Sequence, residues 1–433
     1  MLGAFANAFR TPDLRRKLLF VLFIIAVFRL GAQIPSPGVN VPNVQACFAA
    51  ASQEGSSVFQ AINLFSGGAL LQLTIFALGI MPYITASIIL QLLVVVIPRL
   101  EALKKEGQSG QTKITQYTRY LTLGLAILQA TGITALARSK NLITGCDRDL
   151  LYDDKLSTVL IMITVLTAGT AVIMWLGELI TERGIGNGMS ILIFTQVVAQ
   201  FPGSLWQLKI AKGWWIFGAV IVLGFAIMAA VIFIEQAQRR IPVQYARRMV
   251  GRKMFGGSST YIPLKVNQAG IIPVIFASSL LYLPTMALQF NQTSTSKVLR
   301  WIGLYVANPG HWVHMLLYFV LIIFFTYFYV SITFNPQEVA DNMKQYGGFI
   351  PGIRAGKPTE EYLSYVLSRI TFPGSLYLGL IALIPLIALA TVQANNNFPF
   401  GGTSLLIMVG VALDTVKQIE GQLQQRNYEG FLR

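Results

Sequence analysis

Long apolar runs recur along this sequence, and they constrain its fold more than any other feature. A helix needs about 20 mostly apolar residues to cross the hydrocarbon core of a bilayer, and ten runs suit such spans, one of them interrupted by glycine and proline. The runs lie near 18–30, 64–98 (the interrupted run), 120–136, 156–176, 189–201, 214–234, 271–288, 315–332, 374–392 and 404–413. With 54% hydrophobic and 12% charged residues, the chain is too apolar to keep its whole surface in water. We therefore predict an all-α polytopic membrane protein with ten transmembrane helices.

The positions of Lys and Arg predict the orientation of the chain, because short cytoplasmic loops are enriched in these residues. A cytoplasmic amino end places the basic clusters at 10–17, 99–119, 239–265 and 344–369 on the cytoplasmic side. The loops at 31–63 and 393–402 then lie outside, and neither contains a basic residue. Both termini are predicted to be cytoplasmic. This topology explains most of the net charge of +15 without a nucleic-acid-binding face.

A repeated motif predicts two halves. Residues 78–87 and 269–278 share the pattern G-I-x-P-x-I-x-A-S, and they open the second and seventh predicted spans. Spans five apart cross the bilayer in opposite directions, and inverted halves of this kind place a passage or binding site between them. A chance match between small-residue motifs is the alternative interpretation. We predict an amino-terminal half at 1–201 and a carboxyl-terminal half at 202–433.

The prolines of the repeat predict irregular backbone. Pro82 and Pro273 each lack an N–H, so the carbonyls four residues earlier, at Leu78 and Ala269, are expected to need another partner. Inside a membrane, such a group has to face protein or a water-lined space. The repeat is therefore predicted to border a cavity.

The sequence contains no motif of an enzyme. Phosphate-binding loops, H-E-x-x-H, G-x-S-x-G and C-x-x-C are all missing, and the spacing of His311 and His314 is more typical of a polar turn than of a metal site. We expect no catalytic residue, no metal and no cofactor. The two cysteines, Cys47 and Cys146, lie in predicted external loops; a disulfide is possible, but we favour two unpaired thiols.

Ionisable residues are sparse within the predicted spans. Arg29, Glu178, Glu235 and Asp414 all lie near the ends of their runs. A coupled transporter usually keeps such groups inside the membrane to carry its coupling ion, and the sequence offers no such relay.

Several features allow more than one interpretation. Ile80, Ile84 and Ile88 are four residues apart, so they share one helix face that contacts lipid, packs in a core or lines a pore. The stretch at 64–72 is either a half-helix that re-enters the membrane or an interfacial external helix. The basic segment at 235–253 is a topogenic anchor, a patch for anionic lipids, or a docking site for an acidic partner or ribosomal RNA, and its length favours docking.

Seven stretches together closely resemble the SecY family, the central subunits of bacterial protein-conducting channels. They are NLFSGGA at 63–69, FALGIMPYITASIILQ at 76–91, QYTRY at 116–120, ERGIGNGMS at 182–190, PLKVNQAG at 263–270, PGIR at 351–354 and GGTSLLI at 401–407. The resemblance covers essentially the whole chain. It implies two inverted five-helix halves that open like a clamshell around an hourglass pore.

The resemblance also implies roles for individual residues. An apolar pore ring would consist of Ile80, Ile84, Ile88, Met189, Ile193, Ile275 and Ile407. Met189 stands where the family often has isoleucine. A plug on the external side would consist of Leu64, Phe65, Ser66, Gly67, Gly68, Ala69 and Leu70. A polar cluster at a lateral gate would consist of Thr85, Gln129 and Asn267, which are also polar residues of the kind that bridge helices by hydrogen bonds.

Basic cytoplasmic loops at 236–268 and 334–372 would dock the ribosome or the SecA motor. The residues implied are Arg239, Arg240, Arg247, Arg248, Arg252, Lys253 and Arg354, with Lys253 at a position where arginine is common. The small membrane subunits SecE and SecG, signal peptides, nascent polypeptides and membrane lipids are the other expected partners. The implied function is to translocate unfolded secretory polypeptides across the bacterial cytoplasmic membrane and to release membrane-protein helices laterally. The alternative is an inverted-repeat secondary transporter of a small solute, with Pro82 and Pro273 beside its binding site.

Overall fold

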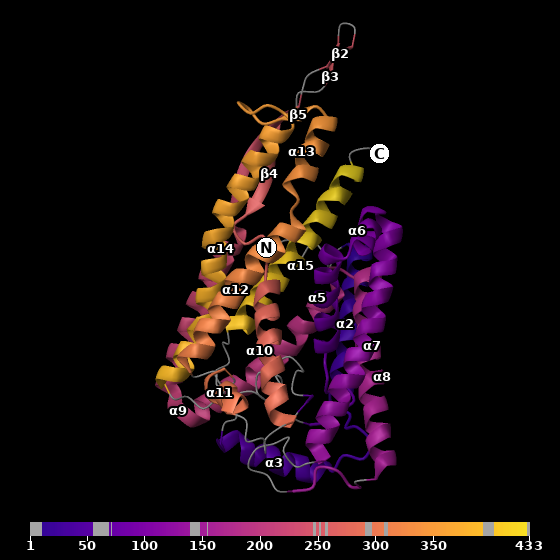
Figure 1. Cartoon of the computed structure of the whole chain (residues 1–433), viewed down its shortest axis with the longest axis vertical. Coiled ribbons are helices and arrows are strands. Elements are labelled where there is room, and N and C mark those ends of the chain that lie inside the picture. The colour runs from indigo at the N-terminus through magenta and orange to yellow at the C-terminus, as the bar shows by residue number, and fades with distance from the viewer. Residues whose placement is uncertain are drawn as a thin grey trace.

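A computed structural model gives the architecture of the chain, which is mostly α-helical (Figure 1). It describes residues 11–54, 69–70, 72–138, 148–153, 155–245, 248–250, 253–255, 259–290, 297–306, 311–392 and 402–430. The helices are α2 (Pro12–Gly31), α3 (Val41–Glu54), α5 (Met81–Val96), α6 (Pro98–Lys105), α7 (Gln108–Arg138), α8 (Leu156–Arg183), α9 (Gly188–Gln236), α10 (Ile272–Phe290), α11 (Lys297–Tyr305), α12 (Trp312–Thr333), α13 (Pro336–Gln345), α14 (Lys357–Val392) and α15 (Gly402–Gly430). The strands are β1 (Gln238–Tyr245), β2 (Arg248–Val250), β3 (Lys253–Phe255), β4 (Ser259–Lys265) and β5 (Gly348–Phe349).

Several helices are long and apolar enough to cross a membrane. Within the described residues there are five, at Gln108–Arg138, Leu156–Arg183, Gly213–Gln236, Trp312–Gln345 and Lys357–Ile384. The pair α5 and α6 makes a sixth if it counts as one span, bent by 99°. Shorter apolar helices lie at Gly188–Gly203 and Ile272–Leu281. The chain therefore has the helical, membrane-spanning character that its apolar runs predict.

Helix packing separates the chain into two groups of helices (Figure 1). On one side α5 contacts α7, α7 contacts α8, and α8 contacts α2; on the other, α12 contacts both α10 and α14. Helix α9 has non-helical backbone at Gly213 (φ 80°, ψ 178°), which divides it into two apolar segments. The groups meet where α10 contacts α5 and α7, and where α15 contacts α9 and α14. Several of the predicted ring residues lie on these helices: Ile84 and Ile88 on α5, Met189 and Ile193 on α9, Ile275 on α10 and Ile407 on α15.

The basic segment forms a small sheet at one end of the molecule. Strand β1 pairs antiparallel with β4 and with β5, while β2 and β3 form a separate hairpin that projects beyond it (Figure 1). Alternation along β1 buries Ile241 and Val243 and exposes the residues on either side. Those two side chains pack with Leu264, Met343 and Leu363 in one apolar cluster. The two predicted basic loops are therefore joined into one folded unit.

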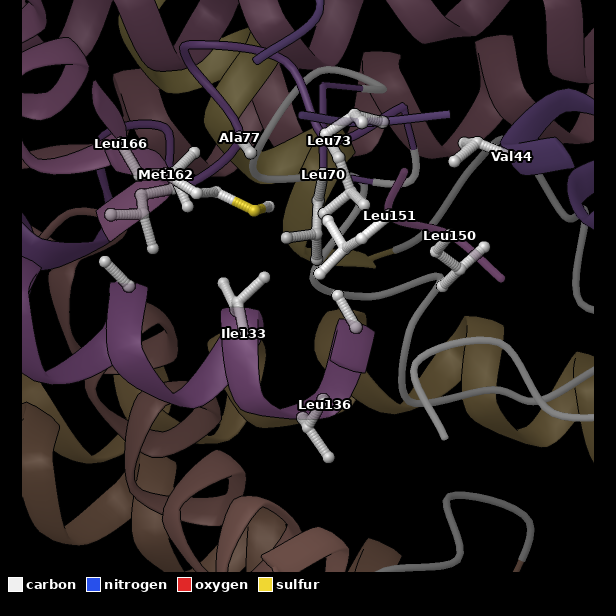
Figure 2. Close-up of a cluster of buried hydrophobic side chains, with 14 of the residues drawn as sticks. Val44, Leu70, Leu73, Ala77, Ile133, Leu136, Leu150, Leu151, Met162 and Leu166 are labelled. Carbon is white, nitrogen blue, oxygen red and sulfur yellow. The ribbon is translucent and has the colours of Figure 1, made fainter. Parts of the chain in front are cut away.

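The described residues between 69 and 80 approach α5 in a series of turns and do not form a helix. Of the expected half-helix at 64–72, only Ala69, Leu70 and Gln72 are described, and all three lie in turns. Leu70 and Leu73 are almost completely buried in a cluster with side chains of α3, α7 and α8 (Figure 2). Burial against three helices holds this segment in place, together with short-range backbone hydrogen bonds such as the one from the N–H of Leu73 to the carbonyl of Leu70 at 3.0 Å.

The interpretation of two unpaired thiols is wrong. Cys47 in α3 is fully buried and disulfide-bonded, and the one other cysteine of the sequence, Cys146, lies outside the described residues. The backbone N–H of Asn40 donates to the carbonyl of Leu150 at 2.9 Å, and the Asn43 side chain donates to the carbonyl of Asp149 at 2.9 Å. These contacts bring the segments at 40–43 and 149–150 together, which their spacing in the sequence does not reveal.

Candidate functional site

An apolar cluster between the helix groups contains four of the predicted ring residues. Ile80, Met189, Ile193 and Ile407 are each less than 10% exposed and belong to one cluster, against which the half-buried Ile84 packs. They come from the turn before α5 and from α9 and α15. The ring residues thus converge from segments up to 327 positions apart, 407 minus 80.

Local sequence positions the start of α9 beside this cluster. Asn187 caps the helix, and its side-chain oxygen accepts from the backbone N–H of Met189 at 3.1 Å and of Ser190 at 3.4 Å. A Cβ on Gly188 would lie 1.8 Å from the carbonyl oxygen of Gly177, so this close approach of α9 to α8 requires glycine. The G-N-G sequence therefore sets the position from which Met189 and Ile193 reach the cluster.

The other two ring residues lie elsewhere. Ile275, in α10, is 5% exposed but is not a member of this cluster, and Ile88, in α5, is half-buried. The cluster is apolar, and its buried side chains have little exposure to solvent. An apolar surface of this kind offers water and ions nothing that replaces a hydration shell.

The two copies of the repeated motif adopt the same backbone. Gly79 (φ 58°) and Gly270 (φ 62°) are both left-handed, a conformation that glycine adopts without strain. Three residues later, Pro82 and Pro273 lie in the first turns of α5 and α10. The expectation that these prolines deprive the Leu78 and Ala269 carbonyls of a partner is wrong, because first-turn N–H groups have no partner within the helix.

The predicted polar cluster is not joined by hydrogen bonds. The Thr85 hydroxyl donates to the carbonyl of Met81 in its own helix at 2.9 Å, and Gln129 is half-buried in α7. Asn267 is 3% exposed, and its Nδ2 donates to Glu235 Oε1 at 2.6 Å and to the carbonyl of Gly270 at 3.1 Å. No hydrogen bond links the three side chains in the part of the chain that the structure describes. Glu235 is a partner that sequence reasoning noted only as an acid at the end of a run.

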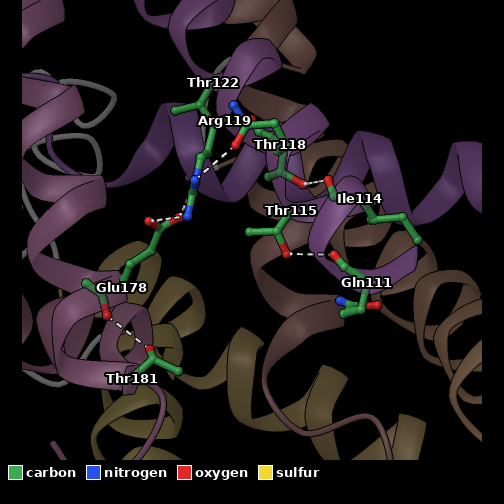
Figure 3. A network of polar contacts seen from close by, with 10 residues as sticks. Gln111, Ile114, Thr115, Thr118, Arg119, Thr122, Glu178 and Thr181 are labelled. Carbon is green, nitrogen blue, oxygen red and sulfur yellow. Dashed lines mark hydrogen bonds and ion pairs between the residues drawn. The ribbon is translucent and has the colours of Figure 1, made fainter. Parts of the chain in front are cut away.

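Helices α7 and α8 are joined by an ion pair between Arg119 and Glu178 that the sequence did not predict. Arg119 Nε and Nη2 donate to the two carboxylate oxygens of Glu178, each at 2.8 Å, and Arg119 Nη1 donates to Gln116 Oε1 at 2.9 Å (Figure 3). The side chains are 38% and 21% exposed. Paired donors matched to paired acceptors fix both distance and angle, so this contact sets the packing of α7 on α8. The arginine of the QYTRY stretch, spaced far from any acid in the sequence, gave no signal of its partner.

A double-mutant cycle is expected to measure this contact. Arg119→Ala and Glu178→Ala should each lower the unfolding temperature. The double variant should lose less stability than the sum of the two single losses, with a coupling of about 1 kcal/mol for a partly exposed pair. Thermal unfolding in detergent measures all four proteins. Additive effects would mean that the pair contributes nothing beyond its separate side chains.

The predicted docking residues are distributed over the small sheet and its hairpin. Arg239 and Arg354 are exposed, and the guanidinium of exposed Arg240 lies 4.8 Å from the centre of the Tyr261 ring. Arg248 lies in β2 and Lys253 in β3. Arg247 and Arg252 lie outside the described residues, as do Leu64, Phe65, Ser66, Gly67 and Gly68 of the predicted plug. Among the residues that are described, no group of three or more His, Cys, Asp or Glu side chains is placed to hold a metal ion.

Comparison with known proteins identifies the family. The SecY family model matches residues 74–416. The chain is 66% identical to the protein translocase subunit SecY of Streptomyces scabiei and 59% identical to that of Mycobacterium tuberculosis, in each case over the full length of both chains. The chain belongs to the SecY family. It is accordingly a membrane protein and a protein-conducting channel of the translocase.

Solved structures share the fold of this SecY family member. A protein-conducting channel matches with a TM-score of 0.62 at 20% identity, covering 93% of this chain and 91% of the other. The yeast Ssh1 complex, solved in its idle state on the yeast 80S ribosome, matches with a TM-score of 0.62 at 15% identity, covering 94% and 89%. At these identities the likeness concerns the fold alone.

Proposed function

We propose that this SecY family member translocates unfolded secretory polypeptides across the bacterial cytoplasmic membrane and releases membrane-protein helices sideways into lipid. The channel is formed by ten spans in two inverted halves, 1–201 and 202–433, with both termini cytoplasmic. Each of the ten predicted runs overlaps a helix, and the left-handed glycine and first-turn proline recur before α5 and α10. The single observation that carries the proposal is the buried apolar cluster, in which side chains of α2 and α8 meet side chains of α9 and α15.

The cluster acts as a gasket around a passing chain. Aliphatic side chains make contacts that do not depend on the sequence of the polypeptide, so they fit a channel with many substrates. Lateral release occurs between α5 and α10, which contact each other at the junction of the two groups. A sufficiently apolar signal helix stabilises the open gate because its side chains gain contact with lipid there.

The segment at 64–70 acts as a plug on the external side. Its described end supports this role, since Leu70 is buried in one cluster with Ile133 of α7 and Met162 of α8 (Figure 2), and Ala69 beside it is also buried. In a related SecY structure, with a TM-score of 0.60 at 19% identity, the plug domain stabilises the closed state of the channel and maintains a membrane seal.

The basic sheet docks the ribosome or the SecA motor on the cytoplasmic side. Exposed Arg239 and Arg354 come from the two loops that the sheet joins, and related channels have been solved with ribosomes. SecE and SecG are the small partners within the membrane. Energy for transport comes from the motor or from translation, because the chain has no phosphate-binding loop.

Site-specific crosslinking tests the proposed path. A photoreactive side chain at Ile84 or Ile275 should form adducts with a stalled secretory chain in reconstituted membranes. The matched control is Val222, which is 69% exposed on α9 and should contact lipid. Adducts at both test positions and none at Val222 would support the path; flux of a small solute without adducts would favour a secondary transporter.

A further inference from the structure

The segments that lead into α5 and α10 are held by the same backbone contacts. Pro82 and Pro273 are 191 positions apart (273 minus 82), and the same offset relates Ile75 to Val266. The N–H of Ile75 donates to the carbonyl of Ile34, shortly after α2 ends, at 3.0 Å. The N–H of Val266 donates to the carbonyl of Ala237, directly after α9 ends, also at 3.0 Å. We call the segments at 75–80 and 266–271 the lead-ins of α5 and α10. A backbone hydrogen bond therefore fixes the start of each lead-in to the end of the preceding span.

The carbonyl oxygens of Ile75 and Val266 each lie against a glycine of another helix. A Cβ on Gly169 of α8 would lie 2.1 Å from the oxygen of Ile75, and a Cβ on Gly374 of α14 would lie 2.3 Å from the oxygen of Val266. Both glycines are buried. Oxygen and carbon do not approach this closely without a bond, so any side chain here would push the lead-in away.

The next residue in each lead-in packs against the preceding span, but with different chemistry. Phe76 stacks on Phe28 of α2 with ring centres 5.7 Å apart. Its counterpart Asn267 donates to Glu235 near the end of α9. Beyond these residues the chain turns through the left-handed Gly79 or Gly270 and enters its helix.

We propose that these two lead-ins are matched hinges on which α5 and α10 rotate when the lateral gate opens, with Gly169 and Gly374 as positioning residues. This inference rests on the proposed function, since it takes α5 and α10 as the gate. A hinge needs one end that is fixed and a few residues that absorb the change in φ and ψ. The backbone pair and the glycine contact fix residues 75 and 266, while the non-helical turns at 76–80 and 267–271 absorb the rotation.

Adding one methyl group at either glycine is expected to bias the gate. The lead-in would move away from α8 or α14 and carry the first turn of its helix out of the packing seen between α5, α7 and α10. In the proposed function the gate is closed while α5 contacts α10, so the population of the open state should rise by about fivefold or more, the shift expected from overpacking by one methyl.

The bias can be measured as the rate at which the channel translocates a protein with a defective signal peptide, relative to the rate for the same protein with its intact signal. Proteoliposomes that contain the channel and its motor would be given one secretory protein with its intact signal, and the same protein with an arginine in the apolar part of the signal. We expect Gly169→Ala and Gly374→Ala to raise the ratio of the second rate to the first by about fivefold. Gly124→Ala in α7 and Gly218→Ala in α9 are matched controls, because nothing lies within 4 Å of a Cβ at either glycine, and they should leave the ratio unchanged.

A second variant covers the case in which the alanine proteins do not fold. Glu235→Ala removes the acceptor of Asn267 without overpacking and should also raise the ratio, while Glu235→Gln, which keeps an acceptor oxygen, should change it less. The hinge proposal would be wrong if every variant that folds had a lower unfolding temperature but an unchanged ratio of rates. It would also be wrong if the two control variants changed the ratio equally. Failure of the unaltered channel to translocate the intact substrate would instead count against the proposed function.

Discussion

Replacing Ile80 and Ile407 together by serine is expected to raise the resting ion flux through the channel by ~tenfold or more, because the barrier to ions at an apolar constriction depends on its dryness. Both side chains are 1% exposed and lie in the apolar cluster, one before α5 and the other in α15. Serine is smaller and brings a hydroxyl group. The space and the hydrogen-bonding groups would admit water where the unaltered channel has contacts between methyl groups.

Dye or ion leak from proteoliposomes measures the effect, with a control for reduced stability. Ile322 of α12 is also fully buried, but it belongs to a different cluster, which contains none of the ring residues. Ile322→Ser should reduce stability by a few kcal/mol, as large-to-small core changes do, and should not raise the leak. An unchanged leak in the ring variant would place the seal elsewhere, with the segment around Leu70 as the next candidate.

The local features of this fold were predictable from the sequence. Spanning helices are determined by the apolarity of about 20 consecutive residues, so the runs overlap helices from α2 to α15. The repeated motif predicted irregular backbone before α5 and α10, and Gly79 and Gly270 share one left-handed conformation there. Such features need only neighbouring residues, and the sequence shows these directly.

Contacts between distant residues were not predictable in the same way. Arg119 pairs with Glu178 across 59 positions and Asn267 with Glu235 across 32, and neither spacing follows a helix or hairpin rule. The basic segment was expected as a loop, yet β1 pairs with both β4 and the distant β5. The prolines were misinterpreted because their effect depends on whether they lie inside a helix or in its first turn.

Reversing the charge of Arg239 and Arg354 together is expected to weaken docking of the ribosome by about tenfold per residue at low salt, since contacts of basic side chains with phosphates carry much of the affinity for nucleic acid. Both side chains are exposed, and they come from loops that the strands β1 and β5 join. Arg240 is less suitable for the test, because its guanidinium lies over the Tyr261 ring and reversal would also disturb the sheet.

Salt dependence separates docking from the other roles of a basic segment. The affinity of reconstituted channels for ribosomes should fall as the salt concentration rises. In a plot of log binding constant against log salt concentration, the double reversal should make the slope shallower by roughly one for each phosphate that the sheet no longer neutralises. Arg138→Glu makes the same charge change at an exposed position at the carboxyl end of α7, on the side proposed to be external, and should affect neither quantity. If the double reversal changed insertion but not ribosome affinity, the segment would be a topogenic anchor. If it changed only binding of the channel to vesicles with anionic lipid, the basic sheet would be a lipid patch, because the same Coulomb attraction would then act on headgroups and not on RNA.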